Sequence, residues 1–196
     1  MKKAIQLLIL FFGLPAFAQI SVADIFTDNM IFQRNEPILI WGKAVPNQLV
    51  EVKFDDETYR TIVAADSTWI VSMQKQPANA NPQSLLIRSG NEEIKLDNIL
   101  IGDVWLLIGQ SNMEFPMQGE MHFEEALKHA NNPMLRFYNP TYIGKNVYGV
   151  PYSEEMLKSL GKADYYSEAL WQESNPSSIK TMSAVGYYFG KEIVER

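Results

Sequence analysis

The sequence contains no cysteine and only two histidines in 196 residues. Small secreted domains often depend on disulfide bonds, so a chain without cysteine must be held together by its hydrophobic core. The composition provides for such a core, because 46% of the residues are hydrophobic and 12% are aromatic. The length allows one domain and part of another.

Long apolar runs are also missing. The apolar run at residues 4–12 is shorter than the roughly 20 residues that a transmembrane helix needs. It follows Lys2 and Lys3 and precedes a small-x-small triplet that ends at Ala18, an arrangement typical of a secretory signal peptide. We therefore expect residues 1–18 to be a signal peptide, and an exported, periplasmic or extracellular protein without membrane insertion.

Positive charge is scarce as well. The formal net charge of the chain is −6 at pH 7, and removal of Lys2 and Lys3 with the signal peptide makes it more negative. An acidic protein of this kind has no electrostatic footprint for nucleic acid or for an anionic lipid surface. The composition therefore favours a small or neutral substrate and leaves the oligomeric state open.

The first part of the chain alternates short apolar runs with polar turns. In the clearest run, Val50, Val52 and Phe54 alternate with Glu51 and Lys53, which places the apolar side chains on one face of a strand. We expect strands at residues 30–33, 37–41, 49–54, 59–64, 69–73, 84–88 and 93–96. Short strands at this spacing predict a small all-β sandwich, here over residues 19–97.

From residue 98 the pattern becomes that of an α/β domain. Apolar residues are nearly continuous between 99 and 108, which is typical of a strand buried on both faces of a parallel sheet. A helix with apolar positions at helical spacing follows at residues 123–130, and a strand at residues 134–138. This order of strand, helix and strand is the opening of an α/β unit.

The remainder of the chain is less regular. Residues 139–180 show no clear period and are expected to form a long loop. Order returns at the end, where an apolar stripe at helical spacing predicts a helix with Ser183 as its N-cap. An α/β domain with so few elements is incomplete, so we expect it to expose a sheet edge and an apolar face.

Ser111 lies where the expected buried strand turns into a helix, which is the position of an exposed nucleophile. Gly109 lets the chain turn sharply and leaves room for a substrate carbonyl. Gln110 and Asn112 carry amides that donate or accept hydrogen bonds beside it. An ester hydrolase also needs a general base for its serine. Taken alone, this run of residues is also typical of an N-cap serine on an ordinary turn between a strand and a helix.

The context of the serine adds a resemblance to a known family. Residues 102–115, GDVWLLIGQSNMEF, closely resemble the nucleophile block of the sialate O-acetylesterase family, carbohydrate esterases of the SGNH-hydrolase superfamily. Residues 25–34 and 37–42 resemble the leading β-sandwich segment of that family. Residues 182–192 resemble its first long helix after the serine block, and the likeness is weakest over residues 139–180.

The resemblance implies both a fold and a reaction. Residues 98–196 would be the truncated N-terminal part of a flavodoxin-like, three-layer SGNH domain. Ser111 would be the nucleophile that removes O-acetyl groups from sialic acid or another acetylated glycan, with Gly109, Gln110 and Asn112 as oxyanion or substrate-binding residues. The resemblance implies no metal and no organic cofactor.

The resemblance also shows what the sequence lacks. The catalytic histidine of the family and its acidic partner belong to later motifs that do not occur here. We therefore expect the base beyond Arg196 and little activity from this chain alone. The alternative is a non-catalytic sugar-binding or structural module, which the missing base favours.

Other candidate residues have ordinary structural interpretations. His122 and His129 are expected at the two ends of the helix at residues 123–130, and a histidine near a helix C-terminus is favoured by the helix dipole. Asp103 is more typical of a turn or cap than of a catalytic acid, and Glu114 of a helix start. Trp41, Trp69 and the tyrosines at 142, 148, 152, 165 and 166 suggest sugar stacking, although the two tryptophans are more typical of a sandwich core.

Overall fold

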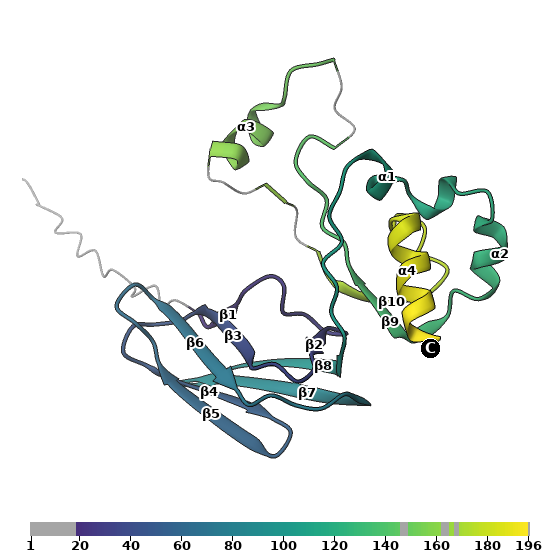
Figure 1. Cartoon of the computed structure of the whole chain (residues 1–196). Coiled ribbons are helices and arrows are strands. Elements are labelled where there is room, and N and C mark those ends of the chain that lie inside the picture. Colours follow the sequence, from purple (N-terminus) through teal and green to yellow (C-terminus); the bar gives the residue numbers. More distant parts are fainter. Residues whose placement is uncertain (1–18, 146–148, 162–164, 167–168, 196) are drawn as a thin grey trace, which may run out of the picture.

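The computed structural model describes residues 19–145, 149–161, 165–166 and 169–195 (Figure 1). The signal peptide expected at residues 1–18 lies outside the described residues. Two units follow each other along the chain: a two-sheet unit at residues 19–102 and a helical unit at residues 103–195.

The two-sheet unit is built from eight strands in two sheets. The first sheet has the order β1 (Ser21–Val22), β3 (Ile38–Lys43), β6 (Thr68–Met73), all antiparallel. The second has the order β2 (Ile31–Gln33), β8 (Glu92–Gly102), β7 (Asn79–Ser89), β4 (Leu49–Phe54), β5 (Glu57–Ile62). In the second sheet β2 runs parallel to β8, and the other neighbours are antiparallel.

The two sheets contribute side chains to one hydrophobic core. Val50, Val52 and Phe54 are buried in it while Lys53 is exposed, as the alternating sequence predicts. Across from them, Ile40 and Val71 of the first sheet enter the same cluster. The strands expected from the alternating pattern are therefore confirmed, with ends that shift by up to six residues, while the short strand β1 was not predicted.

Two features of this unit differ from expectation. The strand β8 continues to Gly102, so the second sheet extends past residue 97. Trp69 is buried as expected, but Trp41 is 43% exposed, which corrects its placement in the core. The reason is the two-residue period of a strand: Ile38 and Ile40 of β3 point into the core, so Trp41 points outward.

The helical unit begins with a segment that belongs to no strand. The apolar run at residues 99–108 was expected to form one strand buried on both faces, but only residues 99–102 are in a strand, as the end of β8. Residues 103–110 lie outside the described sheets, and Leu106 and Ile108 are 85% and 76% exposed. A strand buried on both faces needs strand neighbours and covering helices. Among the described residues this segment has no strand partner, so its apolar side chains stay exposed.

The rest of the unit consists of short helices and one antiparallel pair of strands. Its elements are α1 (Ser111–Glu114), η1 (Met117–Gly119), α2 (Phe123–Lys128), β9 (Asn132–Tyr138), α3 (Glu154–Gly161), β10 (Trp171–Ser174) and α4 (Ala184–Val194). β9 and β10 pair antiparallel. A second core, which includes Met117, Leu135, Phe137 and Tyr187, joins η1, β9 and α4.

The helix at Phe123–Lys128 and the strand that ends at Tyr138 confirm the sequence-based prediction. The expected long loop is wrong in part, because residues 139–180 include α3 and β10. β10 has only four residues and is specified by its pairing with β9, with Gln172 opposite Phe137. So short a strand leaves no readable period in the sequence.

Candidate functional site

Ser111 is the first residue of α1 and is exposed to solvent together with Gly109, Gln110 and Asn112. The carbonyl of Gln110, the N-cap residue, accepts hydrogen bonds from the backbone N–H groups of Met113 and Glu114 at 2.8 and 3.2 Å. The four residues predicted for the site are therefore neighbours on one exposed turn.

The start of α4 holds this turn in place through backbone contacts. The N–H of Met117 donates to Met182 O at 2.9 Å, and the N–H of Ala184 donates to Phe115 O at 2.9 Å. These bonds flank Ser183 and fix the chain immediately after Ser111. The serine turn is therefore anchored by a segment about 70 residues further along the chain.

Ser183 is the N-cap of α4, as the sequence predicts, because its Oγ accepts from the N–H of Gly186 at 3.1 Å. The same Oγ lies 3.4 Å from Sδ of Met113 in α1. One side chain thus begins α4 and contacts the helix that carries Ser111.

Two glycines allow the close packing around the serine turn. A Cβ on Gly109 would lie 2.9 Å from Cβ of Met113, and a Cβ on Gly186 would lie 2.8 Å from Cδ1 of Leu107. Neither approach is compatible with an ordinary side chain. Nearby, the ring of Trp105 packs edge-to-face on Phe189 with centroids 5.2 Å apart, so α4 covers part of the segment that precedes Ser111.

The two histidines are paired with glutamates. Nδ1 of His122 lies 2.9 Å from Oε1 of Glu120, and Nε2 of His129 lies 3.6 Å from Oε1 of Glu125. They flank α2 at its N-cap and C-cap positions, as expected. In the part of the chain that the structure describes, neither histidine hydrogen-bonds to Ser111, so neither is placed as its base.

Glu120 joins His122 to α4. Its Oε2 accepts the Tyr188 hydroxyl at 2.8 Å and the His122 backbone N–H at 2.9 Å. Partial burial acts to raise the pKa of Glu120, but the hydrogen bonds from Tyr188 and His122 outweigh it and hold that pKa below its ordinary value. Burial and the bond to Glu120 raise the pKa of Tyr188 to about 12.

Asp103 and Glu114 have structural surroundings. Oδ1 of Asp103 accepts from Nε of Arg34 at 2.8 Å, which ties the start of the helical unit to the loop after β2. Glu114 is exposed at the end of α1. Glu114 was expected at a helix start and is instead the last residue of the single turn of α1, while Asp103 lies in the irregular segment after β8.

Arg136 in β9 is a residue that the sequence-based argument missed. Its guanidinium is buried and donates to Asn98 Oδ1 at 3.0 Å, to Asn29 O at 3.1 Å and to Asn98 O. Burial lowers the pKa of Arg136, an effect that Glu173 opposes. A signal was present, because an arginine within the apolar run of residues 134–138 is rare unless its charge is paired.

Arg136 and its partners join the two units. Trp171 adds two further bonds, from Nε1 to Ile25 O at 2.9 Å and from its backbone N–H to Thr27 Oγ1 at 3.0 Å. Asn29 and Asn98, which face this junction from the two-sheet unit, have φ values of 65° and 58°. Asparagine adopts this left-handed conformation more readily than other non-glycine residues, so the loop at Asn29 and the strand β8 at Asn98 both tolerate it.

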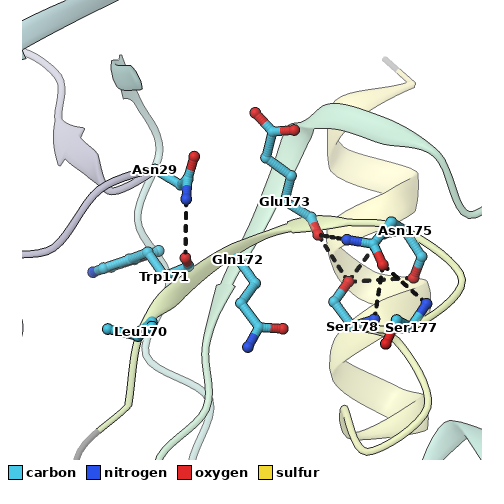
Figure 2. Close-up of a pocket in the computed structure, with 8 residues that line it drawn as sticks. All are labelled: Asn29, Leu170, Trp171, Gln172, Glu173, Asn175, Ser177 and Ser178. Carbon is cyan, nitrogen blue, oxygen red and sulfur yellow. Dashed lines mark hydrogen bonds between the residues drawn. The ribbon is translucent and has the colours of Figure 1, made fainter. Parts of the chain in front are cut away.

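A polar pocket of about 370 Å³ lies at this junction (Figure 2). Its lining residues are Asn29, Leu170, Trp171, Gln172, Glu173, Asn175, Ser177 and Ser178. Figure 2 shows that Asn175 and Ser178 turn toward the backbone of Glu173, whose carbonyl accepts from both at 2.9 and 2.8 Å. These groups satisfy one another and serve to shape the loop after β10.

The described residues hold no cluster of three or more histidine, aspartate or glutamate side chains that suits a metal ion. Among these same residues, none of the helices has the length and apolar character needed to cross a membrane. Three of the tyrosines considered for sugar stacking, Tyr152, Tyr165 and Tyr166, are exposed. Tyr148 lies outside the described part of the chain.

Comparison with solved structures defines the class of fold. The chain matches the crystal structure of a carbohydrate acetylesterase from Xanthomonas citri with a TM-score of 0.74 and 26% identity, over 89% of this chain and 37% of that one. No family model matches the sequence. The fold is therefore that of the corresponding part of a carbohydrate acetylesterase, in the α/β class.

Curated sequences point to the same group of enzymes. The sialate O-acetylesterase of Mus musculus is 26% identical over 184 residues, covering 87% of this chain and 32% of that protein. The sialate O-acetylesterase of Homo sapiens is 26% identical over 188 residues, covering 88% and 34%. The chain is thus similar to sialate O-acetylesterases over most of its own length and spans about a third of the length of these relatives.

Proposed function

We propose that this chain carries the nucleophile of a serine carbohydrate esterase, with Ser111 as the nucleophile and an O-acetylated glycan as the substrate. The observation that carries the proposal is the exposed serine turn at the start of α1, fixed by α4, in a chain that matches carbohydrate acetylesterases over most of its length. Residues 103–195 would then form part of an SGNH-type domain, preceded by a β-sandwich.

The proposed reaction proceeds in two steps. Oγ of Ser111 attacks the acetyl carbonyl while a base accepts its proton, and the sugar hydroxyl leaves with a proton from that base. Water then attacks the acetyl-serine, which releases acetate and restores the hydroxyl. The backbone N–H of Ser111 and the amides of Gln110 and Asn112 are the donors that we assign to the developing oxyanion or to the substrate.

The base is a separate part of the proposal. His122 and His129 are engaged with Glu120 and Glu125 and do not reach Ser111 through a hydrogen bond within the described residues. The chain matches about a third of the length of its relatives. We assign the base and its acidic partner to a region that corresponds to the unmatched two thirds of those relatives. The acetylated sugar is sialic acid or a related glycan, by analogy with the names of the relatives.

The proposal is tested with a chimera in which residues 19–195 replace the corresponding part of the Xanthomonas citri esterase. The chimera, Ser111→Ala and Ser72→Ala are assayed on 4-nitrophenyl acetate, acetylated xylan and O-acetylated sialic acid. We expect Ser111→Ala to lower kcat at least about a thousandfold and the exposed control Ser72→Ala to retain it. Equal activity of the folded chimera and its Ser111→Ala variant would exclude Ser111 as the nucleophile.

A further inference from the structure

A second pocket, of about 730 Å³, lies in the two-sheet unit. It is lined by residues from β1, β3, β5 and β6 and from the turns beside them. In Figure 1 these strands and α1 belong to different parts of the molecule. The pocket therefore has a lining of its own and includes none of the residues assigned to the reaction at Ser111.

Trp41 provides this pocket with an exposed aromatic surface. Its side chain lies on the outer face of β3, opposite Ile70 of β6, and the two residues are 43% and 56% exposed. The buried ring of Phe26 packs edge-to-face on Trp41, with centroids 4.6 Å apart and an interplanar angle of 79°. This contact holds the indole in one orientation while leaving part of it accessible.

Trp69 borders the same pocket but does not turn its indole into it. The side chain is 2% exposed and lies in the core with Val71 and Met73, whereas Ile70, opposite Trp41, points outward. The aromatic surface that the pocket offers is therefore that of Trp41.

The rim of the pocket combines opposite charges with hydroxyl groups. Asp24 and Lys43 contribute one negative and one positive side chain, so the lining carries no net formal charge. Thr61 and Thr68 add hydroxyl groups. Such a lining suits a neutral ligand rich in hydroxyls better than a phosphate, a nucleic acid or a strongly acidic sugar.

We infer that this pocket binds a neutral saccharide. The exposed indole of Trp41 packs against the apolar face of a sugar ring, and the polar groups of Thr61 and Asp24 recognise its hydroxyls. The junction pocket of Figure 2 lacks this character, because its polar groups around Asn175 bond to one another. The site requires no chemistry at Ser111 and is independent of the proposed esterase function.

The four tryptophans of the chain allow a direct test. Each indole N–H gives its own signal in a proton–nitrogen correlation spectrum, and the signals are assigned by single tryptophan-to-phenylalanine variants. The full chain is titrated with xylotetraose, cellotetraose and a methyl sialoside. We expect the neutral sugars to shift the signal of Trp41 and to leave those of Trp105 and Trp171 unchanged.

Matched variants separate binding from folding. Trp41→Ala is expected to raise Kd at least about tenfold, which corresponds to 1.4 kcal/mol, and Trp105→Ala to leave Kd unchanged. Ser111→Ala is also expected to bind normally, which distinguishes this site from the esterase proposal. Absence of saturable shifts with both neutral sugars, stronger binding of the sialoside, or shifts confined to Trp105 and Trp171 would each overturn the inference.

Discussion

The guanidinium of Arg136, on β9 of the helical unit, donates to both the backbone carbonyl and the side-chain oxygen of Asn98, on β8 of the two-sheet unit. Asn98 in turn donates from Nδ2 to Glu173 Oε1 and to Asn29 Oδ1, each at 2.7 Å. The buried positive charge of Arg136 thus belongs to the helical unit and is hydrogen-bonded by groups of the two-sheet unit. The two-sheet unit is consequently fixed to the helical unit by a buried polar network.

Arg136→Ala is expected to destabilise the protein by about 3 kcal/mol, because it leaves the backbone carbonyl and the side-chain oxygen of Asn98 without their guanidinium donor. Equilibrium unfolding in urea measures the change. The control is Arg88→Ala, which removes the exposed ion pair to Glu93 and is expected to cost less than about 1 kcal/mol. Equal losses in the two variants would show that the junction does not depend on Arg136.

Gly186→Ala is expected to destabilise the protein by about 1–3 kcal/mol, even though alanine is the better helix former. The new Cβ would lie 2.8 Å from Cδ1 of Leu107, 3.1 Å from Cε of Met182 and 3.3 Å from Cβ of Ser183, so these side chains must leave their present packing. Gly161→Ala at the end of α3 is the matched control, since no described atom outside its own helix and its chain neighbours lies within 4 Å of its Cβ. Thermal unfolding should place the two variants on opposite sides of the parent, and a stabilised Gly186→Ala would refute the proposed contact.

Tyr188 predicts a change of stability at alkaline pH. Its pKa is raised to about 12 in the folded protein from an ordinary value of 10.0, first by burial and then by its bond to Glu120. The stability that it contributes is fully present below pH 10.0 and is lost as the pH rises toward about 12. Tyr188→Phe should remove this part of the alkaline loss in unfolding experiments from pH 9 to pH 12, and an unchanged loss in that variant would contradict the role of Tyr188.

The chain by itself is expected to hydrolyse 4-nitrophenyl acetate only slowly, because Ser111 has no hydrogen-bonded base among the described residues. Initial rates are compared for the chain, for Ser111→Ala and for His122→Ala. Turnover that is fast in the chain and abolished in Ser111→Ala would contradict this prediction. Loss of that turnover in His122→Ala would in addition identify His122 as the base.

The sequence predicted the two-sheet unit better than the helical unit. The strand around Val52 is evident because apolar and polar residues alternate along an amphipathic strand, one type on each face. Ser183 was also predictable, since an N-cap depends on one side chain and the next three residues. The segment from Val104 to Ile108 was wrongly predicted as a buried strand. A continuous apolar run favours burial, but a buried strand also needs neighbouring strands, which such a run does not reveal.

The candidate site shows the same division. The run of Gly109, Gln110 and Ser111 was recognisable along the chain, because these residues are contiguous. The contact of Met113 with Ser183, the clash that Gly186 avoids and the role of Arg136 join residues far apart in sequence. No local pattern encodes such distances.

The sequence by itself determined the alternation of the strands, the N-cap of α4 and the serine turn with its family resemblance, because each depends on neighbouring residues. The tertiary structure decided that the serine turn lies against the start of α4, that the two units join at Arg136, and that Trp41 faces outward beside the buried Trp69. These features follow from packing and from paired buried charge, which act between parts of the chain that meet only after folding.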